Sequence, residues 1–460
     1  MISGGLVCNT KKEMPFMALG KRSLRRIAGL LTARLPELQL EHVQDPRSLR
    51  GRRWKHLEVL LRAVILAIAG RRQSCKEAEA LTDDLSLTVR RQLGIRRRIP
   101  DTTLRTTLCA VEPDALRFSL WAQIRAAYRR HALKPDRLPF GVVAIDGKST
   151  AIETWDDHYA QRKTHSQGQG VYGLVRTLTA TLTSSAAKVC LDACPIPSAT
   201  NEMGHFPHAL GDLMKAYRTL HLFQVITTDA GMCSLANANL VVDTYHLDYL
   251  FRLKADQPTL FDEAKRHLGR KRPEHALAKT EDVVGKYLVV RYLFLTEDMA
   301  ALLDWKHLKT ALRIHVEKRL LETNSIVETE DHYAISSLAR ESLTDGQWLH
   351  LFRNHWAVEN QCHNTWDKIF REDERPWIKA GTLPAKAKGS APQGTVVVML
   401  LRRMAYNLLA LYRAVTLRSE EKRWTPWKEI MGHIYATLIS ATPSIFEGLR
   451  QRIVWAHVVD

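Results

Sequence analysis

The strongest constraint on the fold is a change of apolar pattern near residue 138. From Leu24 to about His131, apolar residues recur at helical spacing, as in the stretch 57–65. That spacing predicts an all-helical unit. Phe140–Ile145 is instead a short, continuous apolar run, which is typical of a strand buried on both faces. We therefore expect an N-terminal helical domain followed by an α/β core.

The segment after residue 138 contains further strand patterns. Val171–Leu182 and Ala187–Ala193 follow the first strand and predict an antiparallel three-stranded meander, with a polar loop at 162–170. Leu222–Thr227 is another buried strand, and a helix is expected over 201–217 before it. The first strand is expected to end at Asp146 and the later one at Asp229. Two acidic residues would then follow two buried strands.

The rest of the chain alternates again between helix and strand patterns. Helices are expected at 235–245 and 258–268, and a short strand at 249–253. Alternating apolar residues at 287–295, 311–316 and 333–337 indicate a β-rich insertion. Helical spacing returns at 344–370, 396–412 and 427–439, and 384–394 has the composition of a flexible basic loop. The expected domains are a flexible extension (1–20), the helical domain (21–137), a first core part (138–274), the insertion (275–340), a last core part (341–415) and a helical tail (416–460).

Charge is distributed unevenly along the chain, whose net charge is +18. Residues 1–140 carry 28 Lys and Arg against 13 Asp and Glu, residues 141–370 carry 25 against 28, and residues 371–460 carry 14 against 8. Basic flanks around a mildly acidic middle favour a polyanionic partner such as nucleic acid over a merely solubilising surface. The acidic middle suits a divalent-metal site.

Arginines in the helical domain cluster at expected helix ends and connections, where phosphate contacts are often made. A plain preference of arginine for helix C-termini explains part of this clustering. The candidates for DNA contacts are Arg71, Arg72, Arg96, Arg97 and Arg98.

The chain has seven cysteines, and only Cys190 and Cys194 are closely spaced. No zinc-ligand pattern stands out, and neither a signal peptide nor a membrane span is expected. We expect a protein of the reducing cytoplasm with no membrane partner.

The expected helix at 344–370 places ionisable groups and a tryptophan on one broad face, because these residues recur every three or four positions. Glu359 on this face could join Asp146 and Asp229 to bind a divalent cation. An interhelical polar network is the alternative reading. Likewise, Asp146-Gly147 could be an ordinary turn, and Asp243 or Asp248 could take the place of Asp229.

An ordered set of sequence blocks carries more information than these spacings. The blocks are AIDGKS (144–149), ATNEM (199–203), ITTDAGMCS (226–234), DYLFRLKADQPTL (248–260), YAISSL (333–338) and RNHWAVENQCHNTWDKIFRED (353–373). In this order they resemble the insertion-sequence DDE transposases of the H-repeat-associated type, over about residues 40–412. The chain departs from the family pattern at Val284-Gly285-Lys286 and at Lys254-Ala255-Asp256-Gln257. The spacing from Arg353 to Glu359 is also shorter than in a related signature.

The resemblance implies an RNase H-like core, a mixed β-sheet flanked by helices and interrupted by a β-rich insertion. It implies that Asp146, Asp229 and Glu359 form the catalytic triad and hold two Mg²⁺ or Mn²⁺ ions. Residues implied to support the triad or contact DNA are Lys148, Lys254, Arg353, Asn360, His363 and Asp367. The implied partners are double-stranded DNA, as terminal inverted repeats and target, and a second copy in a DNA-bound homodimer.

Two alternatives keep the same fold. One is a domesticated DNA-binding protein that no longer cuts, and the other is a metal-dependent nuclease that stops after hydrolysis. Metal-dependent nicking separates the first from a transposase, and strand-transfer products separate the second.

Overall fold

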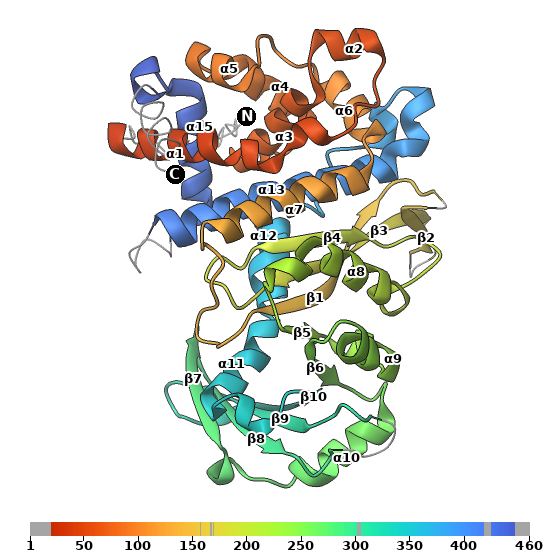
Figure 1. Cartoon of the computed structure of the whole chain (residues 1–460), viewed down its shortest axis with the longest axis vertical. Coiled ribbons are helices and arrows are strands. Elements are labelled where there is room, and N and C mark those ends of the chain that lie inside the picture. The colour runs from red at the N-terminus through yellow and green to blue at the C-terminus, as the bar shows by residue number, and fades with distance from the viewer. Residues whose placement is uncertain are drawn as a thin grey trace, which may run out of the picture.

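The computed structural model describes residues 20–446, except for residues 157, 166, 167, 169, 301–304 and 418–424. Most of the expected N-terminal extension and the end of the expected C-terminal tail therefore lie outside the described residues. The described part is a mixed α/β structure, in which a layer of helices covers one end of a long, mixed sheet (Figure 1).

The N-terminal third of the chain is helical, as its apolar spacing predicts. Its helices are α1 (Lys21–Arg34), α2 (Leu49–Trp54), α3 (Leu57–Ala69), α4 (Cys75–Asp84), α5 (Leu87–Leu93), α6 (Asp101–Ala110) and α7 (Pro113–Arg129). Helix α3 is apolar on almost every face because other helices surround it. Serine caps start α4 and α5, where the Ser74 and Ser86 hydroxyls accept backbone N–H groups.

Two C-terminal helices complete the core of this helical layer. They are α13 (Ala391–Leu411) and α15 (Trp427–Ser440), and their apolar residues belong to the same buried cluster as those of α1 and of α3 to α6. Helix α13 lies beside α7, between the helical layer and the sheet (Figure 1). Helices α13 and α15, which fall in the expected last core part (341–415) and helical tail (416–460), therefore share a core with N-terminal helices.

The described strands form one sheet of ten, in the order β2-β3-β1-β5-β6-β10-β9-β8-β7, with β4 also paired to β3. The strands are β1 (Val142–Ile152), β2 (Ala160–Thr164), β3 (Val171–Leu182), β4 (Cys190–Pro195), β5 (Val225–Thr228), β6 (Asp248–Leu253), β7 (Ala278–Val284), β8 (Tyr287–Thr296), β9 (Thr310–Leu320) and β10 (Ile326–Ser336). The expected antiparallel meander is present as β1-β3-β4.

Strand β5 pairs parallel to both β1 and β6. The parallel connections run through α8 (Glu202–Tyr217) and α9 (Leu235–Asn239), and α10 (Pro258–Leu268) follows β6. Strand β10 pairs antiparallel with β6, so the β-rich insertion continues the sheet of the core instead of forming a separate unit.

Three expectations about local structure were wrong. Strand β1 does not end at Asp146, because β3 remains hydrogen-bonded to it as far as Ile152. The expected flexible loop at 384–394 is helical, as a 3₁₀ segment (Ala385–Ser390) followed by the first turn of α13. The expected single helix at 344–370 is α11 (Asp345–His355) and α12 (Asn364–Lys368), joined by a π-helical turn (Val358–His363).

One segment of the described chain, Ala385–Thr416, is long and apolar enough to span a membrane. Its most apolar window is fully buried inside the structure. The segment contains α13, so its apolar character is explained by packing against helices and sheet on all sides.

Candidate active site

Asp146 and Asp229 are neighbours because strands β1 and β5 run parallel. Ile145 pairs with Thr228 in the register of the two strands, and each aspartate is the next residue in the chain, Asp146 within β1 and Asp229 just after β5. Side chains at matching positions of parallel neighbours lie on the same side of the sheet. Strand β5 ends at Thr228, whereas β1 continues to Ile152. Both carboxylates therefore lie where β5 ends and no longer covers that side of β1.

Glu359 is brought to these aspartates by the π-helical turn after α11, which packs against β1 and β3. Single π turns within helices are frequent at functional sites. The helix before it is anchored on the sheet by His355, whose Nδ1 lies 3.0 Å from Thr227 Oγ1 in β5. Asn354 also donates from Nδ2 to the Thr183 carbonyl at 2.7 Å.

The three carboxylates are coupled electrostatically. Burial, followed by the charges of Glu359 and Asp229, raises the pKa of Asp146 to about 8. Burial and the charge of Asp229 likewise raise the pKa of Glu359, while the cations Arg252 and Lys254 oppose this shift. Like charges held together in a poorly solvated site favour the protonated form. A bound cation would relieve this repulsion and favour the ionised carboxylates.

Asp146 and Asp229 differ in how their oxygens are satisfied. The Gly147 N–H donates to Asp146 Oδ1 at 2.9 Å, and His363 Nδ1 lies 3.4 Å from Oδ2. Burial, with the charges of Arg403 and Lys148, lowers the pKa of His363 to about 3, so its ring is neutral. Asp229 Oδ1 is buried and has no hydrogen-bond partner within the described part of the chain. A buried oxygen in this state costs free energy unless a ligand satisfies it.

A fourth carboxylate, Glu202, was not among the residues expected from the sequence. Glu202 is the first residue of α8, which Asn201 caps by accepting the Gly204 N–H at 2.9 Å. Its carboxylate lies against Gly147, since an ideal Cβ on that glycine would stand 1.9 Å from Glu202 Oε1. Burial and the charge of Asp229 raise the pKa of Glu202. The ATNEM block contains this residue, but only the chain fold shows that it faces the aspartates.

Lys148 is held by carboxylates beyond the cluster. Its Nζ lies 3.0 Å from Asp367 Oδ1 in α12 and 2.9 Å from Asp373 Oδ1, and Thr150 Oγ1 donates to Asp373 as well. The residue before Asp373, Glu372, is fully buried against Arg403 of α13, with 2.8 Å between Arg403 Nη2 and Glu372 Oε1. These pairs fix the segment after α12 to both the sheet and α13.

The other candidates lie at different places. Arg353 donates to Asp282 of β7 at 2.7 Å, so it ties α11 to the sheet. Lys254, at the end of β6, is exposed and lowers the pKa of Glu359, whereas Asn360 is exposed on the π turn. Arg252 of β6 was not anticipated. It stacks over Trp356 at 4.5 Å and counteracts the charge of Glu359.

The five candidate arginines lie between helices, Arg71 and Arg72 after α3 and Arg96 to Arg98 between α5 and α6. Arg71, Arg96, Arg97 and Arg98 are exposed. Two of the five have partners, since Arg72 stacks over Tyr435 at 3.9 Å and Arg98 Nε lies 3.1 Å from Glu79. The fold therefore leaves several of these cations accessible.

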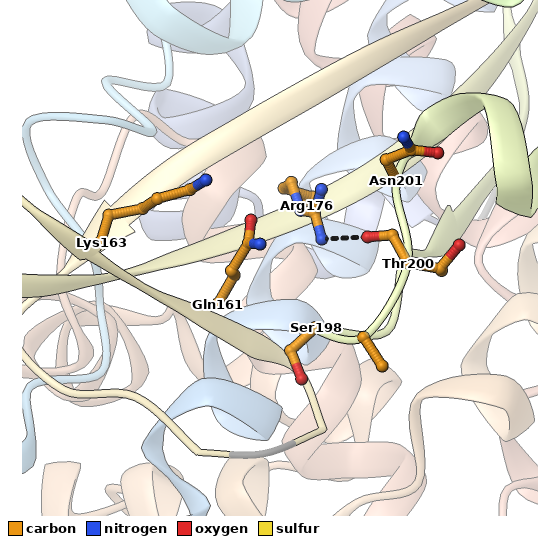
Figure 2. Close-up of a pocket in the computed structure, with 7 residues that line it drawn as sticks. Gln161, Lys163, Arg176, Ser198, Thr200 and Asn201 are labelled. Atoms are coloured by element: carbon orange, nitrogen blue, oxygen red, sulfur yellow. Dashed lines mark hydrogen bonds between the residues drawn. The ribbon is translucent and has the colours of Figure 1, made fainter.

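A pocket of about 440 Å³ adjoins the Glu202 end of the site. Figure 2 shows it between β2, β3 and the loop before α8, with Lys163, Gln161 and Arg176 on the strands and Ser198, Thr200 and Asn201 on the loop. Arg176 donates from Nη2 to the Thr200 carbonyl at 2.6 Å, and its charge opposes that of Glu202. The pocket therefore offers cations and amides beside a group of carboxylates.

No protein-family model matches the chain, and a search of curated proteins finds no similar sequence. The interpretation of the site therefore depends on its geometry and on the ordered sequence blocks.

Proposed function

We propose that this protein is a DNA transposase of the DDE type, with Asp146, Asp229 and Glu359 as its catalytic triad. The observation that carries the proposal is the in-register placement of Asp146 and Asp229 at the end of β5, where Glu359 raises the pKa of Asp146. The order of the sheet supports an RNase H-like core, because an antiparallel meander is joined by parallel strands and flanked by helices. The insertion precedes the Glu359 segment, as the resemblance implies.

The residues at the site fit a pair of Mg²⁺ or Mn²⁺ ions. The donors are hard carboxylate oxygens, which these ions prefer. Asp229 Oδ1 is buried without a partner, and the Glu202 carboxylate occupies the space where any side chain at residue 147 would begin. Asp146, Asp229 and Glu359 would hold the ions. When bound, such ions activate an attacking water and neutralise the leaving oxygen of a phosphodiester.

The chain's own residues align the reactants. The paired strands β1 and β5 hold Asp146 and Asp229 in place. A phosphate bound to ions at these carboxylates would therefore keep a constant position relative to the strands. Lys254 and Arg252, which face Glu359, supply positive charge near a bound backbone phosphate. In the first step water cleaves the strand and frees a 3′-OH, and in the second this hydroxyl attacks a target phosphodiester. No protein nucleophile is needed.

DNA binding is assigned to the basic surfaces. The exposed arginines of the helical layer would contact the phosphates of the terminal inverted repeats. The pocket lined by Lys163 and Arg176 would accept a phosphate beside the site. A DNA-bound homodimer and a cytoplasmic location belong to the same proposal, by analogy with this chemistry.

The test uses the DNA that flanks this gene, incubated with the purified protein and Mg²⁺ or Mn²⁺. Nicks at repeat ends that vanish in the Asp146→Asn variant, followed by joining to a second DNA, support the proposal. Nicking without joining identifies a nuclease instead. Specific binding without cleavage in either metal identifies a DNA-binding descendant that no longer cuts.

A further inference from the structure

A second group of potential metal ligands lies between β4 and α8. Cys194 is near the end of β4, while His205 and His208 are one turn apart in α8. One potential ligand atom from each of the three lies within 4.8 Å of the others. We propose that Cys194, His205 and His208 bind a zinc-type transition-metal ion, at a site that is independent of the proposed transposase chemistry.

The distances are close to those of a coordinated metal. Cys194 Sγ and His205 Nε2 are 3.3 Å apart. Around a tetrahedral zinc ion, with Zn–S near 2.3 Å and Zn–N near 2.0 Å, neighbouring ligand atoms stand about 3.5 Å apart. His208 completes the group from the surface, since 60% of its side chain is exposed and its ring centroid lies 4.9 Å from that of His205. Three protein ligands leave a fourth position for water.

The ring of His205 is already set for coordination. It makes a hydrogen bond to the backbone of Pro195. Proline has no N–H, so this bond is accepted by the Pro195 carbonyl and the donating ring nitrogen carries a proton. Nε2 of His205 lies 3.3 Å from the Cys194 sulfur. Metal-binding histidines typically donate their second nitrogen to a carbonyl or carboxylate in this way.

His208 has a comparable outer partner. Its Nε2 lies 3.3 Å from Asp212 Oδ2, one turn further along α8. A carboxylate that accepts from this nitrogen leaves Nδ1 of the ring for the metal.

The surrounding charges favour an added cation. Arg117 is buried and pairs with Asp192, Asp212 and Asp114, and Lys215 also pairs with Asp212. Two cations thus face three carboxylates. These five side chains carry one net negative charge. A divalent ion that binds and displaces the Cys194 proton adds one net positive charge, so the total charge of the group becomes zero. The metal-free alternative is a hydrogen bond from the Cys194 thiol to His205.

The consequence of a bound ion would be a cross-link between β4 and α8. Helix α8 begins at Glu202, one turn before His205, so the ion would fix the helix that presents Glu202 to the aspartates. Thiolate and imidazole ligands select Zn²⁺ over Mg²⁺. The two sites can therefore be occupied and measured separately.

The test titrates the purified full-length chain, stripped of metal by a chelator, with Co²⁺ as a spectroscopic probe of zinc sites. We expect a sulfur-to-cobalt charge-transfer band that saturates near one ion per chain and disappears when Zn²⁺ is added. Cys194→Ser should abolish the band. His208→Ala, which removes an exposed side chain and should leave the fold intact, should weaken Co²⁺ binding about tenfold or more.

Two variants serve as controls. Asp146→Asn should keep the band, because oxygen ligands give no sulfur charge transfer. His433→Ala changes another accessible histidine, in α15, and should bind Co²⁺ like the unmodified chain. A missing band in the unmodified chain, or an unchanged band and affinity in His208→Ala, would overturn the proposal. Neither result bears on DNA cleavage.

Discussion

The carboxylate of Glu202 occupies the place where a side chain on Gly147 would begin, because an ideal Cβ there would stand 1.9 Å from Glu202 Oε1. The residue after Asp146 must therefore be glycine for Glu202 to reach the site. The two residues belong to different elements, β1 and α8, and their contact brings the start of α8 against the strand that carries Asp146.

Gly147→Ala tests this contact. The added methyl group should displace the Glu202 carboxylate, and because this is the far end of a flexible side chain the loss of unfolding free energy should be modest, about 1 kcal/mol. In the Glu202→Ala background the same change should lower the free energy of unfolding much less, because no carboxylate then occupies the space beside residue 147. Urea unfolding of the four proteins measures the coupling. Gly432→Ala in α15, where nothing lies within 4 Å of the new Cβ, is the matched control. Equal costs in both backgrounds would contradict the close contact.

Asp146→Asn should stabilise the metal-free protein at neutral pH. In the folded chain the pKa of Asp146 is about 8, well above its ordinary value near 4. The unfolded chain therefore releases this proton first, and rising pH between about 4 and 8 favours unfolding. Asparagine removes this penalty, so thermal unfolding in a chelator at pH 7 should show a gain of roughly 1 to 3 kcal/mol. The gain should vanish below pH 4. A variant less stable at pH 7 would show that the carboxylate is not destabilising.

Asp229→Asn and Glu359→Gln should each abolish strand cleavage while DNA binding survives, since each keeps the side-chain shape but removes a negative charge. Loss of an essential metal ligand typically lowers such rates by several orders of magnitude. Cleavage and gel-shift assays on the same repeat-end DNA separate the two effects. Asp243→Asn is the control, because Asp243 is paired with Lys306 at the surface. A triad variant that cuts at the unmodified rate would remove that residue from the site.

Arg252→Gln should shift the pH dependence of cleavage. Arg252 lowers the pKa of Glu359 against burial and the charge of Asp229, so its removal should raise that pKa further. The acidic limb of the pH–rate profile should move to higher pH, with about a tenfold loss of rate near neutrality. Arg252→Lys keeps a cation there and should restore much of the profile. A uniform loss at every pH would indicate a purely structural role, through stacking on Trp356.

Replacing Arg96, Arg97 and Arg98 together by alanine should weaken binding to repeat-end DNA and lower the slope of log affinity against log salt by about 2 to 3. Arg98 contributes least, because Glu79 already pairs with it. The control replaces the exposed Arg270 and Arg272, which follow α10 at the opposite end of the molecule. An unchanged salt slope would place the DNA on another basic surface.

Local patterns predicted the strands and helices that carry apolar residues. Strand β3 and helix α10 have the expected bounds, because their apolar spacing extends to both ends. Strands β2 and β7 were missed, since both are polar, partly exposed and set by pairing with a neighbour. The end of β1 was misplaced for a related reason: its second half is held by β3 alone.

The candidate site was accessible to sequence reasoning only in part. Asp146 and Asp229 follow apolar strand patterns, so spacing indicated them, and the ordered blocks singled out Glu359. Glu202 and Arg252 act through tertiary contacts that no local pattern encodes. Glu202 lies against Gly147, and Arg252 stacks on Trp356. The Cys194 group was missed because its ligands come from two elements and match no short zinc motif.

The shared core of the helical layer has a consequence for the order of synthesis. Helices α1 and α3 to α6 leave the ribosome early, but α13, which shares their core, begins only at Ala391. Domains ordinarily fold as they emerge, N-terminal part first. Here the early helices cannot bury their complete core until α13 has been made. A product that the ribosome releases prematurely therefore lacks a complete helical layer. Only a fully translated message yields a chain that can fold throughout.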